Sequence, residues 1–198
     1  MLNRDYTGST TYNFYNKCCI NDEYVNTIGA YPANKMASVL TSPVATNMWT
    51  EFFLPEVIDI PDVKPNMEGI IEVRSCIEIL SQRVVKTPIV RGYEAADGTQ
   101  ILGNTIGNNE CTNLTGRKLV IEGLLTQKVI YTAEVAEQSV HSAHFSIPFS
   151  TFIIIEANTP LSQRFKVTPY IEDIYVCRLS ERSIFKNTTI FIKASKVC

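Results

Sequence analysis

Six cysteines supply the most reactive side chains of this sequence. Cys18 and Cys19 are adjacent within a polar N-terminal segment, and Cys198 is the last residue. Adjacent cysteines bridge each other only with strain, so each is better placed to bond a different partner. We therefore predict that Cys18, Cys19 and Cys198 form disulfides between chains, after exposure to an oxidising environment, because the cytosol keeps thiols reduced. Reduced thiols without a role are the alternative.

Metal binding and catalysis find little support in the other reactive residues. No two cysteines form a CxxC pair. His141 and His144 lie three apart in a β-rich context, where their side chains would point to opposite faces of a strand. Adjacent Glu172 and Asp173 would also face opposite ways, so they are expected to pair with an arginine or to cap a turn. The sequence contains no GxSxG, GxGxxG or P-loop motif. It therefore predicts a protein that is not an enzyme and that holds no metal or cofactor.

The composition indicates that strands must position these residues. The chain has 198 residues and a net charge of -2, with 22 Ile, 16 Val and 19 Thr against 11 Leu and 11 Ala. β-branched side chains fit pleated sheets better than helices, so an all-β protein is expected. A net charge this small gives no field to attract nucleic acid or an anionic membrane. No apolar stretch approaches the roughly 18 residues of a membrane span, and residues 1–15 lack a secretory apolar core.

Residues 1–50 differ from the rest of the chain. They hold five of the nine Tyr and seven Asn but only six charged residues, and their apolar periodicity is weak. We expect an extended N-terminal arm that docks on a neighbouring subunit; a disordered tail is the alternative. A weak helical pattern occurs around 33–40, and Val25 and Ile28 fit a short strand. The aromatic side chains expected to make the arm's contacts are Tyr6, Tyr12, Phe14, Tyr15 and Tyr24.

Residues 51–198 carry the repeated two-residue alternation of strands. Gly123 is expected to form a bulge and Pro88 to mark an edge or bulge. Seven to nine strands at regular spacing predict an antiparallel β-sandwich of jelly-roll-like type, preceded by the arm. The expected strands cover residues 52–61, 69–80, 83–91, 117–134, 144–156, 164–179 and 188–194, with a turn at Asp97-Gly98.

Three ordered sequence blocks resemble the SPOCS-domain family of spore-coat and spore-envelope assembly proteins from clostridia and their relatives. The blocks are Thr115-Gly116-Arg117-Lys118-Leu119, Ser139-Val140-His141-Ser142-Ala143-His144-Phe145 with Pro148-Phe149, and Tyr170-Ile171-Glu172-Asp173 with Arg182. The resemblance extends over roughly residues 50–195 and implies a non-enzymatic β-rich module. The motif residues taken as structural are Gly116, Phe145, Phe149, Tyr170, Glu172, Asp173 and Arg182. The two Phe are expected in the core, and the last four residues are expected to form a polar corner.

The sequence and the resemblance together predict a self-assembling structural subunit of the spore envelope, in the coat, the exosporium or an appendage fibre. The expected partners are the protein itself and other spore-envelope proteins, and no nucleic acid, membrane or small-molecule substrate is expected. Synthesis is expected in the mother-cell cytoplasm and deposition on the spore surface. One alternative is an adaptor for a coat morphogenetic protein. Another is a glycan-binding sandwich that uses Tyr93, Tyr131 and Tyr175.

Overall fold

Strands make up most of the protein in the computed structural model, which describes residues 25–41, 48–89, 93–94, 96, 100–101, 115–157 and 159–197. Within these ranges there are nine strands and one helix. In chain order they are β1 (Asn26–Ile28), α1 (Ala33–Thr41), β2 (Trp49–Asp59), β3 (Met67–Ile89), β4 (Tyr93–Glu94), β5 (Gln100–Ile101), β6 (Thr115–Ala133), β7 (Val140–Ile154), β8 (Phe165–Arg178) and β9 (Ser183–Lys196).

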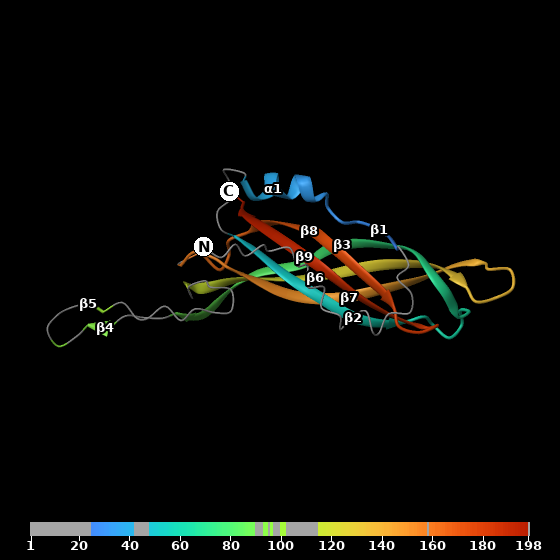
Figure 1. Ribbon diagram of the computed structural model, residues 1–198. Coiled ribbons are helices and arrows are strands. Elements are labelled where there is room, and N and C mark those ends of the chain that lie inside the picture. Colours follow the sequence, from blue (N-terminus) through green and yellow to red (C-terminus); the bar gives the residue numbers. More distant parts are fainter. Residues whose placement is uncertain are drawn as a thin grey trace, which may run out of the picture.

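Two sheets pack face to face and confirm the predicted all-β sandwich. One sheet has the strand order β1-β3-β6-β7, and the other has the order β2-β9-β8. Figure 1 shows the second sheet lying across the first. All these pairings are antiparallel except the short one between β1 and β3. The sheets also approach each other at their sides, where β3 lies next to β8 and β2 next to β7.

The core lies between the two sheets and is built from alternate residues of the long strands. In β6 every second side chain from Leu119 to Ala133 is buried, and in β9 the same holds from Ile184 to Ala194. This is the two-residue period that a half-buried strand requires. Phe149 is 8% exposed and belongs to the core, as expected. Phe145 lies on the same face of β7 and packs, partly buried, against the core, also as expected.

The interior also encloses polar side chains. Lys186 is fully buried in β9 and forms an ion pair with Glu56 of β2. Burial is the main cause that lowers the pKa of Lys186, and the bond to Glu56 opposes it. Gln127 of β6 spans the sandwich, because its Nε2 donates to Ser75 Oγ at 3.0 Å and to Thr188 Oγ1 at 3.3 Å. These bonds connect the two sheets and satisfy polar groups that would otherwise destabilise the core.

Residues 67–89 form one long strand rather than the two that the sequence predicted. The pairing of β3 with β6 continues through residues 80–83, with a register shift between Ile79 and Ser81. Another of the four register shifts in this pairing lies between Lys86 and Ile89, so a bulge occurs next to Pro88 as predicted. Bulges bend a strand without ending it, which is why a break in the sequence alternation looks like a strand boundary.

The segment before α1 crosses from one sheet to the other. β1 pairs with β3, and two residues later Ala30 bridges Ile171 of β8, where Tyr31 N donates to Ile171 O at 2.7 Å. Gly29 makes the turn between them with a φ of +119°, and a Cβ there would lie 2.1 Å from Ser75 O. Only glycine fits this position. The predicted helix near 33–40 and the short strand near Ile28 are both present.

The prediction of a bulge at Gly123 is wrong. Gly123 pairs in register with Phe149, and the extra residue near this level belongs to β3, between Ile79 and Ser81. Gly123 is needed for space instead, because a Cβ would lie 2.3 Å from Phe149 Cζ. The ring of Phe149 therefore lies over the backbone of β6, in a place that any larger residue would fill.

Substituting Gly123→Ala is expected to lower the free energy of unfolding by about 1–3 kcal/mol, because an overpacked core must displace the ring. Urea unfolding would measure this. The matched control is Gly123→Ala combined with Phe149→Leu, which should lose less than the sum of the two single variants. Wild-type stability for Gly123→Ala alone would contradict the steric account.

Candidate functional site

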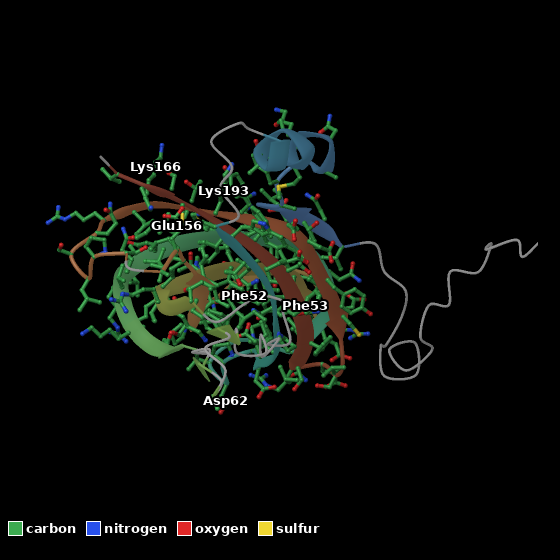
Figure 2. The ribbon with its side chains drawn as sticks, turned by 90° about the vertical axis from the view of Figure 1, so that its left-hand side faces the viewer. Phe52, Phe53, Asp62, Glu156, Lys166 and Lys193 are labelled. Carbon is green, nitrogen blue, oxygen red and sulfur yellow. The ribbon has the colours of Figure 1, made fainter. Side chains whose placement is uncertain are left out.

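The outer face of the β2–β9–β8 sheet exposes large apolar side chains. Trp49, Phe53 and Val57 lie four residues apart on the same face of β2 and are 49%, 63% and 60% exposed. Their neighbour Phe52 points the other way and packs on Phe149, with ring centroids 5.4 Å apart. Figure 2 labels Phe52 and Phe53, which come from successive positions of this strand. Water disfavours such a surface, and exposed apolar patches mark sites of protein contact.

One end of this face is covered by α1 and the segment before it. Lys193 of β9 donates from Nζ to Val39 O at 2.6 Å, and Figure 2 shows α1 above this lysine. Tyr31 packs edge-on against Tyr170, with ring centroids 4.9 Å apart. Met36 of the helix is only 8% exposed. The described part of the arm thus folds onto its own sheet at this end.

The other end of the face holds Cys177. Cys177 pairs with Phe185, and Phe185 pairs with Val57, so these three side chains form one row across the sheet. Cys177 is disulfide-bonded and only 5% exposed, although Val57 in the same row is well exposed. Cys76 of β3 is the other described cysteine, and it is free and exposed. The sequence gives no signal that singles out Cys177, because no local pattern places this residue on the apolar face.

Arg182 fastens the turn between β2 and β3. Its guanidinium donates to four oxygens, with Nη1 bonding Lys64 O at 3.3 Å and Asn66 Oδ1 at 2.8 Å. Nη2 bonds Ile60 O at 2.9 Å and Pro61 O at 2.8 Å. A planar cation with five donors suits several carbonyl oxygens at once. The residue acts as a structural clamp between segments more than 115 positions apart in the chain.

The four residues expected in a polar corner do not come together in the described structure. The hydrogen bonds of the Arg182 side chain go to residues 60–66, whereas Glu172 and Asp173 lie on β8 at the bulge between Ile171 and Asp173. Tyr170 packs on Tyr31 under the arm. Distance along the hairpin explains the separation, because Arg182 lies in the turn between β8 and β9, whereas Asp173 pairs with Thr189, six positions along β9 from Ser183.

Glu172 lies in an unfavourable environment for a carboxylate. Partial burial is the first cause that raises its pKa above the ordinary value of 4.5, and the nearby charge of Glu51 is the second. Gly116, another motif residue, is buried with a φ of +81°, a left-handed conformation that favours glycine. The backbone conformation at Gly116 therefore disfavours any residue that carries a side chain.

The outer face of the other sheet is different in character. Arg74, Lys128 and His144 form a row across β3, β6 and β7, beside a shallow hollow of about 270 Å³. Arg74 Nε donates to Glu72, so part of this positive charge is neutralised. His141 faces the other way and stacks on Tyr131 with centroids 5.9 Å apart, as predicted for residues three apart on a strand. No group of three metal-binding side chains occurs within the described ranges.

Several predictions of binding residues cannot be placed or are wrong. The inter-chain candidates Cys18, Cys19 and Cys198 lie outside the described residues, as do the arm aromatics Tyr6, Tyr12, Phe14, Tyr15 and Tyr24. The glycan platform of Tyr93, Tyr131 and Tyr175 is not formed, because Tyr131 is 0% exposed in the core. Its hydroxyl donates to Pro65 O at 3.2 Å, inside the sandwich.

The fold is a β-sandwich that exposes apolar side chains on the outer face of one sheet. The family model described as SipL, SPOCS domain matches residues 99–178, which include β6, β7 and β8. This confirms the resemblance, over a shorter range than residues 50–195, and it indicates a sporulation-related role. Among the motif residues only Arg182 lies beyond the match. No curated protein and no solved structure matches the chain. In the described part of the chain, no helix has the length and apolar character needed to span a membrane.

The clamp predicts that Arg182→Ala lowers the free energy of unfolding by about 2–3 kcal/mol, since hydrogen bonds to charged groups each contribute roughly 1.5–3 kcal/mol and this side chain is partly exposed. Arg182→Lys should be intermediate, because an ammonium group cannot reach all four oxygens. Chemical unfolding measures both, with exposed Arg164→Ala as the control. Equal stability of the Ala and Lys variants at Arg182 would contradict the clamp.

Glu172 gives a pH-dependent prediction. Because its native pKa is raised, the native chain binds this proton more tightly than the unfolded chain, so stability is lost as pH rises above about 4.5. Glu172→Gln is therefore expected to melt at a higher temperature than wild type at pH 7, with the difference vanishing near pH 3.5. Glu51→Gln should give a smaller gain of the same sign. A difference that does not change with pH would refute the assignment.

Proposed function

We propose that this protein is a self-assembling structural subunit of the bacterial spore envelope, in the coat, the exosporium or an appendage fibre. It acts without catalysis or a cofactor, and its partners are further copies of itself and other spore-envelope proteins. It is made in the mother-cell cytoplasm and deposited on the spore surface. The N-terminal arm makes the subunit contacts, and inter-chain disulfides formed from among the candidates Cys18, Cys19 and Cys198 make them permanent.

One observation carries this proposal: Trp49, Phe53 and Val57 are exposed together on the outer face of β2. Burying one such side chain contributes roughly 1.5–3 kcal/mol, so a contact that covers these side chains is favourable. Part of that free energy is lost to the cost of association. The apolar contact therefore assembles subunits reversibly, and a disulfide then prevents their dissociation on dilution.

The family match supports the location of this assembly. A sporulation-related role together with a β-sandwich that exposes an apolar sheet face fits a building block of a spore layer. The aromatic-rich segment 1–24 has the composition to pair with such a face, because Tyr combines apolar area with a hydrogen-bonding group.

An adaptor for a coat morphogenetic protein is the second candidate. The same apolar face would bind one different partner, and the family match is equally compatible with that role. The two functions differ in stoichiometry. A building block forms polymers by itself, whereas an adaptor stays monomeric until its partner is added.

Negative-stain electron microscopy and non-reducing gels test the proposal on the full-length chain. Fibres or sheets are expected, with a ladder of disulfide-linked species that collapses on reduction. Cys18→Ser, Cys19→Ser and Cys198→Ser, made singly, should each shorten the ladder if that residue links chains. Phe53→Glu should reduce assembly, and Val63→Glu is its control, since Val63 is 93% exposed in the turn after β2. Monodisperse monomers under oxidising conditions would reject the building block in favour of the adaptor.

A further inference from the structure

Cys177, at the far end of the apolar face, forms a disulfide whose partner can be inferred from the strand register. Cys177 is on the outer side of β8, yet it is 5% exposed while Val57 in its row is 60% exposed. Cys76 is free and is therefore not the partner of Cys177. The strand register gives the distance along the sandwich from Cys177 to the described residue nearest each remaining cysteine.

Cys198 of the same chain is too far away. Lys196 pairs with Phe165 at the start of β8, and Val197 N donates to Arg164 O at 3.0 Å. Cys177 lies twelve positions after Phe165, which is about 40 Å along a strand at roughly 3.3 Å per residue. A disulfide needs Cα atoms within roughly 7 Å, so one further residue beyond Val197 cannot bridge this distance.

Cys111 is excluded by the length of β6. At one end of β6, Thr115 pairs with Ile89 of β3. At the other end, Ala133 pairs with Met67. Arg178 Nη1 donates to Met67 O at 3.1 Å, which puts Cys177 at the Ala133 end. Eighteen positions of strand, about 60 Å, separate the two ends. The four residues from Cys111 to Thr115 extend at most about 14 Å.

The N-terminal segment approaches Cys177 from the correct direction. Asn26 pairs with Glu72 and Ile28 with Arg74, so the chain before Asn26 leads toward the Met67 end of β3, which is the Cys177 end of β8. Cys177 lies six positions beyond Ile171, where Ala30 bridges β8, about 20 Å along the strand. Seven residues separate Cys19 from Asn26 and extend up to about 24 Å, so Cys18 and Cys19 are within reach.

We propose that Cys177 forms its disulfide with one cysteine of the Cys18-Cys19 pair of its own chain, and that this bond anchors the base of the N-terminal arm on the outer face of β8. Two thiols are oxidised to one disulfide, and their two electrons and two protons pass to a thiol oxidant such as a small-molecule disulfide. The second cysteine of the pair and the aromatic residues before it are then held at the surface.

This inference deepens the proposed function and rests on it only for the role of the second cysteine. The adjacent pair divides its bonds, because one cysteine fixes the arm within the chain and the other is presented to a neighbouring subunit. A strained bond between adjacent cysteines is thereby avoided. The arm begins its path to a neighbour from a fixed point, which reduces the conformational freedom that association must remove.

Tryptic mapping of the oxidised full-length chain tests the proposal, after free thiols are alkylated. The cysteines fall in separate fragments, 18–35, 75–83, 92–117, 167–178 and 197–198. In the monomer band of a non-reducing gel, fragment 167–178 should be linked to fragment 18–35. A link to 92–117 or 197–198, no link, or a 167–178 to 18–35 link found only in dimers and larger species would overturn the proposal.

Anchoring also predicts a change in proteolysis. Brief trypsin treatment of Cys177→Ser should cut after Lys17 several-fold faster than in wild type, and Cys76→Ser should match wild type, because Cys76 is free. Equal cleavage of the Cys177→Ser and wild-type chains would contradict the anchor. The two proposals fail separately: a mapped link without polymers removes only the assembly function, and polymers without that link remove only the anchor.

Discussion

The pairing of β2 with β9 is the constraint on which the rest of the molecule depends. β2 pairs with β9 without a register shift from Trp49 to Asp59. Because opposite residues in an antiparallel pair share a face, this register sends Phe52 inward and Phe53 outward. A slip of one residue would exchange the two faces, placing Glu51 and Phe53 toward the core and exposing Phe52. The pairing also joins the first and last long strands, so it closes the sandwich.

Buried polar contacts make that register the only favourable one. Lys186 needs the carboxylate of Glu56, which lies directly opposite it across β2 and β9. A slipped strand would leave a buried ammonium group without its partner, at a cost of several kcal/mol. Gln127 acts in the same way between the sheets, since it bonds Ser75 on one and Thr188 on the other. Specificity of pairing and stability of the core therefore arise from the same few side chains.

The two outer faces of the sandwich differ in the side chains that they expose. The β3–β6–β7 sheet presents charged groups such as Arg74 and Lys128 to solvent, and its strands also expose the apolar side chains of Leu80 and Val140. The β2–β9–β8 face keeps apolar residues at its surface and covers part of them with α1.

Much of the architecture followed from local pattern, and the site did not. The two-residue alternation and the excess of β-branched residues predicted an all-β sandwich, and the bulge near Pro88 and the helix near 33–40 were also foreseen. The predicted strand boundaries were wrong at a bulge, because the register shift between Ile79 and Ser81 interrupts the sequence alternation inside a continuous strand. The prediction of a bulge at Gly123 was wrong, since glycine is required there by the ring of Phe149, which comes from another strand and excludes a Cβ.

The sequence by itself determined the class of fold and the residues available for cross-linking, because side-chain period and cysteine number are local properties. Tertiary structure alone decided that Cys177 shares a row with Val57, that Arg182 binds the turn at 60–66, and that Tyr131 is buried. Each of these depends on which strands pair and in what register. That choice depends on contacts between residues far apart in the sequence, such as Val57 with Phe185 and Arg182 with Ile60, and no local pattern encodes it.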